Sequence, residues 1–304
     1  MISRIDYKGL AWVDVRNPEA EDVVRLTKEF ELSPGVAEDL LKPSLRPEVR
    51  SYGSYFYLVL HLPLFDAQNH SHRSRELDIV VGKKFLLTVH YDQIEPLTEF
   101  FKLCDLNIAF RESCFEDTAV KLFYMMWREL YRNLLGELDY VQQKVNQIEE
   151  RIFSGREKKL IEDISLLRRD ILDFSRSLRT HEPVLESLGG YGRDFFGTPF
   201  QSQVDELALH WRRIMTLIDN NKDTLETLYD TNNSLLTHRS SEVIKVFTML
   251  ALLTFPLTLI ATIFSIDALS RPIVGRPHDF WIIIGLMILV VLGMLAFFKY
   301  RRWI

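Results

Sequence analysis

The chain has 304 residues, enough for two domains and a membrane anchor. Charged residues make up 26% of it and the formal net charge is -5, so any membrane-spanning sequence must be concentrated in one part of the chain. With 37 Lys and Arg against 42 Asp and Glu, and no basic stripe, the sequence does not support nucleic-acid binding. It also contains no glycine-rich phosphate loop, nucleophile elbow or metalloprotease helix motif, so we do not expect an enzyme.

Residues 1–115 are predicted to form a mixed α/β cytoplasmic domain. Runs of β-branched and aromatic residues predict strands at residues 9–15, 55–64, 77–81 and 85–90, and helical spacing predicts helices at residues 20–30 and 36–41. No signal-peptide core is present in residues 1–14, which favours the cytoplasm. In that reducing compartment we expect Cys104 and Cys114 to be packed thiols. His70 and His72 are expected to lie in a solvated loop, because they lack further metal ligands.

Residues 116–242 are predicted to form a stalk of long helices. Charged, apolar-periodic sequence predicts an antiparallel pair at residues 117–154 and 157–187. Four glycines and a proline then predict a loop at residues 188–199. A third helix is expected from about Phe200, because neither Pro nor Gly interrupts residues 201–255. It should continue directly into the membrane.

Two apolar segments predict a transmembrane hairpin. Residues 243–264 and 280–298 are each long enough for a hydrocarbon core of about 30 Å. They leave a short external loop at residues 265–279 and a basic tail at residues 299–304. Positive charge flanks both spans on the same side, at His238, Arg239, Lys245, Lys299, Arg301 and Arg302. We therefore expect a protein of the cell inner (plasma) membrane with both termini in the cytoplasm and the lipid bilayer as a partner.

A polar seam follows the predicted helix from Asp230 to Asp267. Steps of four and three residues give Asp230, Ser234, Thr237, Ser241, Ile244, Thr248, Ala251, Phe255, Thr258, Thr262 and Ser265, of which eight are Ser, Thr or Asp. A seven-residue repeat keeps one face of a helix turned towards its partners, so this seam predicts a face on a bundle axis. The alternative is that the hydroxyls only allow close helix packing and bond back to their own carbonyl groups.

The run FPLTLIATIFSID at residues 255–267 resembles the CorA family of divalent-cation channels, whose first span ends in a Pro-Leu-Thr run followed by Gly-Met-Asn. Other segments look like recurring segments of that family: WVDV at residues 12–15, EDL at 38–40, RPEVRSYGSY at 46–55, LTVH at 87–90 and KYRRWI at 299–304. The likeness covers nearly the whole chain. It also matches the order of parts: an α/β cytoplasmic domain, a long-helix stalk, a two-helix transmembrane hairpin and a basic tail.

The resemblance implies a homopentamer whose first-span helices line a central pore. It places pore-lining residues at Asp230, Thr237, Ser241, Ile244, Phe247, Phe255, Thr258 and Thr262, and the seam adds Thr248. It also places Glu206 where the family has an acidic residue of a regulatory magnesium site between subunits. The implied ligands are divalent metal ions, transported or regulatory, and no other cofactor is expected.

The likeness fails at the outer mouth, where Ser265, Ile266 and Asp267 replace Gly-Met-Asn. A ring of Asp267 carboxylates would still offer oxygen ligands but adds negative charge, so cations should be attracted more strongly and released more slowly. The external loop carries Arg271 and Arg276, which either repel cations or pair with Asp267 and Asp279 or with lipid headgroups.

Two functions follow from these features. The first is a divalent-cation transporter, carrying magnesium or a transition metal such as zinc, cobalt or nickel; a carboxylate ring near His278 would suit the transition metals. The second, motivated by the changed mouth and the arginines, is a paralogue that no longer conducts and serves as a membrane-bound metal sensor or scaffold.

Overall fold

A computed structural model describes residues 1–44, 46–66, 71–116, 118–154, 160–266, 273–275, 277–301 and 303. The chain divides into two compact units, Met1–Tyr229 and Asp230–Ile304. Each is described by itself. One long helix, α8 (Thr198–Ser265), contributes residues to both units.

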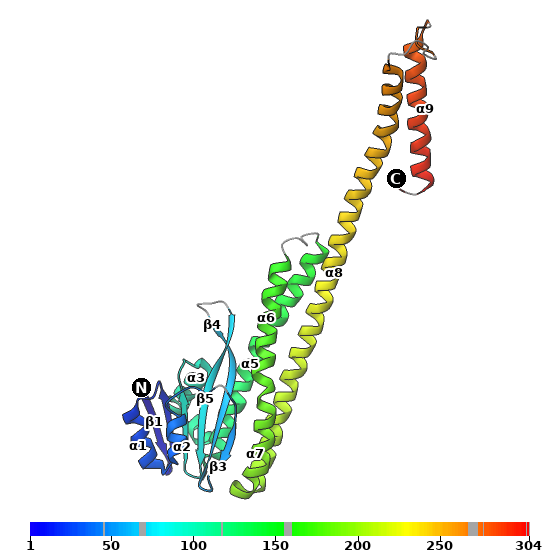
Figure 1. Ribbon diagram of the computed structural model, residues 1–304. Helices are drawn as coiled ribbons and strands as arrows, with labels where there is room; N and C mark the ends of the chain where they lie inside the picture. The colour runs from blue at the N-terminus through cyan, green and yellow to red at the C-terminus, as the bar shows by residue number, and fades with distance from the viewer. Residues whose placement is uncertain are drawn as a thin grey trace. The chain divides into compact units, whose positions relative to one another are not determined.

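The first unit contains a six-stranded sheet and seven helices that precede α8 (Figure 1). The strands are β1 (Ile2–Tyr7), β2 (Leu10–Arg16), β3 (Val49–Ser51), β4 (Tyr55–Asp66), β5 (Ser71–Gly82) and β6 (Phe85–His90). The helices are α1 (Ala20–Phe30), α2 (Pro34–Asp39), α3 (Glu95–Leu106), α4 (Ile108–Cys114), α5 (Ala119–Phe153), α6 (Leu160–Arg179) and α7 (His181–Phe196).

The sheet has the order β1-β2-β6-β5-β4-β3, and only the β2–β6 pair is parallel. One face packs on α1 and α2 through a core that includes Val15, Leu26 and Val59. The other face is covered by α5 and α6, with α3 packed against α5. Alternation of side chains along each strand explains why both faces are apolar, since the sheet is the middle of three layers.

The predicted α/β class is confirmed, and each predicted strand and helix of this domain has a counterpart in the structure. Strands β1 and β3 and helices α3 and α4 were not predicted. Strand β1 lies at the sheet edge, where it buries only one residue fully, and β3 has three residues. Short or half-exposed strands of this kind carry little hydrophobic periodicity.

The predicted loop at residues 188–199 is wrong, because α7 continues to Phe196. Gly192 serves close packing rather than chain flexibility. A Cβ atom added to Gly192 would lie 1.9 Å from the Phe200 ring at the start of α8. Among the glycines at residues 188–199, Gly197 is the one with a positive φ (+84°), a backbone conformation that favours glycine, and it ends the helix.

We expect Gly192→Ala to lower the free energy of unfolding by about 2 kcal/mol, because the methyl group requires the Phe200 ring to move. Gly190→Ala is the matched control. A Cβ atom at Gly190 meets nothing within 4 Å, so this variant should be neutral or more stable by roughly 0.5–1 kcal/mol. Thermal unfolding of both variants measures the difference, and equal effects would contradict the packing role of Gly192.

A buried histidine connects the helices to the sheet. The hydroxyl of Tyr131 in α5 lies 2.9 Å from His181 Nδ1, and His181 Nε2 lies 2.9 Å from the His61 carbonyl oxygen in β4. Nε2 therefore donates and Nδ1 accepts. The side chains of Tyr131 and His181 are fully buried, and burial lowers the pKa of His181 to about 4.

Replacing His181 with Leu should lower the free energy of unfolding by about 3 kcal/mol, because the Tyr131 hydroxyl and the His61 carbonyl oxygen lose their partners in the core. Tyr131→Phe should cost less, since it removes one polar group and leaves only Nδ1 unpaired. The unfolded state binds a proton at an ordinary histidine pKa near 6.5. Stability should therefore fall as pH decreases from about 6.5 towards 4 in the wild type, and fall less steeply in His181→Leu. Equal slopes in unfolding scans would contradict this role.

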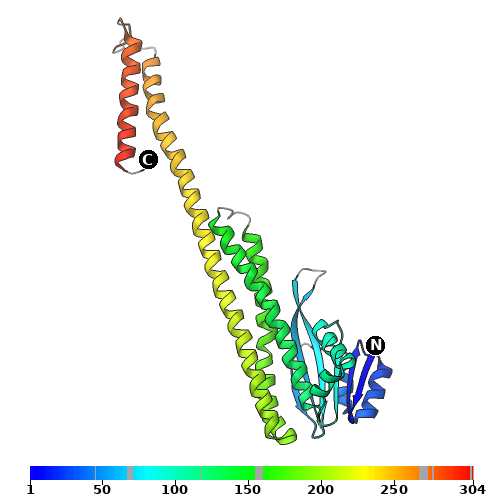
Figure 2. The same ribbon diagram turned by 180° about the vertical axis from the view of Figure 1, so that it is seen from behind.

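The second unit consists of the last part of α8 and α9 (Asp279–Tyr300). Both helices are long and apolar enough to cross a membrane. Each of the two predicted spans lies within one of them. Figures 1 and 2 show α9 alongside the end of α8 from opposite sides.

Candidate ion pathway

The polar seam lies on the surface of α8 in the single chain. All eleven of its positions, from Asp230 to Ser265, are exposed, and so is Phe247. The exposed fraction reaches 62% at Ile244 and 72% at Phe255. These side chains are therefore available to other copies of the chain or to a central axis.

A different face of α8 packs within the hairpin. Its half-buried side chains form one stripe: Leu253, Pro256, Leu257, Ile260 and Phe264. A matching stripe on α9 is formed by Ile283, Met287, Val290, Val291 and Met294, and it ends at the buried Phe298. At 3.6 residues per turn, this α8 stripe and the part of the seam from Ala251 to Ser265 are centred roughly 160° apart around the helix. The seam hydroxyls are consequently not what packs α8 against α9.

The seam threonines donate to their own helix. Thr248 Oγ1 lies 2.8 Å from the Ile244 carbonyl oxygen, while Thr258 Oγ1 and Thr262 Oγ1 each lie 2.9 Å from the carbonyl oxygen four residues earlier. The alternative derived from the sequence is right about this geometry. A hydroxyl that has donated its hydrogen inwards still has lone pairs, and on an exposed face they point outwards. The seam therefore presents neutral oxygen acceptors.

The seam changes character along its length. Asp230, Ser234, Thr237 and Ser241 make the first part polar, with His238 and Arg239 close by in sequence. The middle part is apolar, with Ile244, Phe247, Ala251 and Phe255. Thr248 is the one hydroxyl residue of the seam in this part. Thr258, Thr262 and Ser265 restore hydroxyl groups at the far end. An ion following this face would pass an apolar stretch between two oxygen-rich ones.

Only part of the predicted mouth is described. Helix α8 ends at Ser265, and Ile266 is exposed. Asp267, Arg271 and Arg276 lie outside the described residues. Asp279 accepts hydrogen bonds from the backbone N–H groups of Gly275 at 3.0 Å and Phe280 at 2.7 Å, so its carboxylate organises the start of α9. These two bonds give Asp279 a structural role that the sequence did not reveal.

Glu206 lies on an exposed part of α8 in the first unit. Its Oε1 is 3.8 Å from His210 Nε2. Burial, together with a hydrogen bond to Glu206, raises the pKa of Tyr124 in α5. Within the described residues, no three His, Cys, Asp or Glu side chains are arranged to hold a metal ion. A regulatory site at Glu206 would thus need ligands from outside this set, as the predicted site between subunits does.

An acidic groove between α7 and α8 was not predicted. Its volume is about 920 Å³, and its lining includes Glu182, Glu186 and Asp205. The four-residue spacing of Glu182 and Glu186 is visible in the sequence. Gly189 and Gly190 of α7 also line this groove. Because the sequence predicted a loop after Ser187, it did not reveal a helix wall at these residues.

Comparison with known proteins identifies the family. A family model described as CorA-like Mg²⁺ transporter protein matches residues 7–301. The chain belongs to this family. It is therefore a member of a transporter family, and its two apolar helices are the expected membrane-spanning part.

Relatives with a curated description match over almost the whole chain. The cobalt/magnesium transport protein CorA of Methanocaldococcus jannaschii is 22% identical over 303 residues, which cover 100% of this chain and 94% of the relative. The protein of the same description from Thermotoga maritima is also 22% identical, with 98% and 85% covered.

The fold of the family is present in full. The complete structure of the CorA magnesium transporter from Methanocaldococcus jannaschii aligns with a TM-score of 0.85 and 21% sequence identity, covering 99% of this chain and 94% of that structure. At this identity the likeness concerns the fold. It agrees with the predicted order of α/β domain, long helix and C-terminal apolar helix.

Proposed function

We propose that this member of the CorA-like family conducts divalent metal cations along the seam of α8. Several copies of the chain surround the pathway, each contributing the face that α9 leaves uncovered. The family resemblance gives the number of copies as five. The chain crosses the inner membrane twice, with both termini in the cytoplasm, because the basic residues flank the spans on that side.

The observation that carries this proposal is the position of the seam opposite the α9-packing stripe. A face that carries the hydroxyl oxygens of Thr248, Thr258 and Thr262 along a membrane-spanning helix is less favourable against lipid than an apolar face. When several chains associate around an axis, this polar face is removed from lipid and lines a water-containing path. The hydrogen bonds from Thr258 and Thr262 to the helix backbone fix their oxygen atoms towards that path.

The neutral oxygens of the seam suit a hydrated ion, which they contact through its water shell. Magnesium loses water reluctantly and fits such a path. The Ser265-Ile266-Asp267 mouth adds a ring of carboxylates that also accepts zinc, cobalt or nickel. We propose magnesium and these transition metals as the candidate ions, with Asp267 as the first ligand from outside.

Ion flux into proteoliposomes tests the proposal. Full-length protein should admit at least one of magnesium, cobalt, nickel and zinc faster than protein-free liposomes do. Changing Ser265, Ile266 and Asp267 together to Gly, Met and Asn should shift the preference among these ions if the mouth selects between them. Protein that passes none of the four ions would contradict conduction.

The second candidate is a membrane-bound metal sensor or scaffold that does not conduct. The observation that favours it is the changed mouth. Isothermal titration of the full-length protein in detergent with magnesium and zinc would show binding without flux if this function holds. Flux through the wild type would contradict it.

A further inference from the structure

Two carboxyl groups of the α/β unit are buried side by side. Glu76 and Asp78 are two residues apart on β5, so both side chains project from the same face of the sheet. Asp78 is fully buried and Glu76 is 8% exposed. This arrangement is costly for two negative charges, because each loses water and each repels the other.

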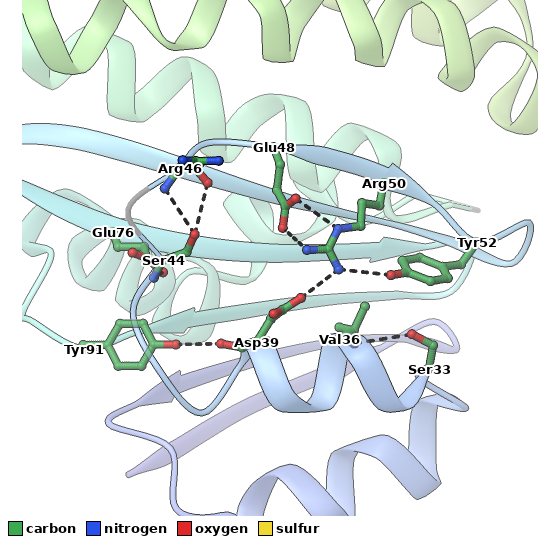
Figure 3. A network of polar contacts seen from close by, with 10 residues as sticks. All are labelled: Ser33, Val36, Asp39, Ser44, Arg46, Glu48, Arg50, Tyr52, Glu76 and Tyr91. Carbon is green, nitrogen blue, oxygen red and sulfur yellow. Dashed lines mark hydrogen bonds and ion pairs between the residues drawn. The ribbon is translucent and has the colours of Figure 1, made fainter.

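Two basic side chains near the pair, Arg50 and His61, are directed at other groups. The guanidinium group of Arg50 is bound by Asp39 at 2.8 Å and by Glu48, as Figure 3 shows. His61 Nε2 lies 3.0 Å from the Ser44 carbonyl oxygen and 3.5 Å from Glu76 Oε2. Because it is closer to the carbonyl, the Nε2–H is directed at Ser44. His61 Nδ1 is buried without a hydrogen-bond partner.

Hydrogen bonds reach two of the four carboxyl oxygens of Asp78 and Glu76. Glu76 Oε1 accepts from the Ser44 backbone N–H at 2.7 Å, and Asp78 Oδ2 accepts from the Tyr91 hydroxyl at 3.3 Å. Asp78 Oδ1 is buried and has no partner, and Glu76 lies two residues away on the same face of β5. A carboxylate oxygen left in this way is expensive, but an O–H group there would donate to Glu76.

We propose that Asp78 and Glu76 form a carboxylic acid–carboxylate pair that binds a single proton, with the Asp78 hydroxyl donating to Glu76. The other charged and titratable groups around the pair are Asp39 from α2, Glu48 just before β3, Arg50 from β3, Tyr57 and His61 from β4, Tyr91 and Asp92 after β6, and Arg176 from α6, which pairs with Asp173 at 3.7 Å. Burial and the Glu76 charge raise the pKa of Asp78 to about 9, so the proton is retained at neutral pH. A bound metal ion is the competing occupant.

Infrared difference spectroscopy tests the proton directly. The wild type minus Asp78→Asn spectrum at pH 7 should contain the C=O stretch of an un-ionised carboxylic acid, which is separate from the carboxylate bands. The control spectrum, wild type minus Asp223→Asn, should lack it, because Asp223 is exposed on α8. Absence of the band from the Asp78→Asn difference would overturn the proposal.

Thermal unfolding of the full-length protein in detergent gives an independent test. The folded state keeps a proton that the unfolded state releases above an ordinary aspartate pKa. Stability due to this group therefore falls as pH rises towards about 9. Between pH 7 and 9 the Tm of Asp78→Asn should rise relative to wild type by roughly 5 °C. A difference in Tm that is the same at every pH would contradict the pair, and so would stabilisation of the wild type but not Asp78→Asn by magnesium or zinc.

Discussion

Replacing Thr258 and Thr262 together by Val should reduce divalent-cation flux by tenfold or more. Val has nearly the shape of Thr but lacks the hydroxyl oxygen, so helix packing is kept while two oxygen rings of the proposed path are lost. In every copy, the ion's water shell then loses acceptors that an apolar wall cannot replace. A loss of about 1.4 kcal/mol in stabilisation corresponds to tenfold in rate. Stopped-flow measurement of ion entry into proteoliposomes gives the ratio.

Thr254 supplies the matched control for this variant. It is an exposed threonine of the same span, and its hydroxyl also donates to the helix backbone, at 3.0 Å from the Leu250 carbonyl oxygen. It lies outside the seam, so Thr254→Val should leave flux within about twofold of wild type. Equal losses from Thr254→Val and from the seam variant would show that hydroxyl groups support the helices rather than the ion.

The second large effect is expected at Asp267. Removing its carboxylate in Asp267→Ala should slow uptake at low ion concentration by about tenfold or more, because a charge-assisted contact contributes about 1.5–3 kcal/mol. Asp267→Asn keeps an oxygen ligand and loses the charge. It should therefore weaken attraction less than Asp267→Ala and speed release. Concentration dependence of flux separates the two effects.

For Asp267→Asn, we expect half-saturation at a higher ion concentration and a maximal rate at least equal to that of the wild type. If Asp267→Ala conducts as well as the wild type at every concentration, the residue is not the entrance ligand. If Asp267→Ala and Asp267→Asn both lose all flux, the charge and the oxygen ligand of Asp267 do not make separate contributions to ion entry.

Much of the architecture follows from local sequence patterns. The helix predicted at residues 20–30 matches α1, and the strand predicted at residues 85–90 matches β6, since both have strong periodicity and clear ends. The error at residues 188–199 has a tertiary cause. Position 192 is helical, and it is a glycine because the Phe200 ring occupies the space that a side chain would need. The sequence does not reveal that contact.

The candidate site divides in the same way. A seven-residue repeat from Asp230 to Ser265 was sufficient to identify the seam, because one helix carries all of it. What the sequence could not supply was the packing stripe on the other side of α8, which depends on how α9 lies against it. The Asp78 and Glu76 pair was also missed. Its surroundings come from α2, β3, β4, α6 and Tyr91, which are distant from it or from one another in sequence.

Thiol modification at Thr258→Cys is the most direct test of the claim that ions move along the seam. The native thiols, Cys104 and Cys114, are buried in the α/β unit and would be replaced by Ala. A membrane-impermeant, positively charged thiol reagent should block flux when the cysteine replaces Thr258 and leave it unchanged when the cysteine replaces Leu257 on the stripe that packs against α9. Full flux after complete modification at position 258 would contradict the proposed pathway.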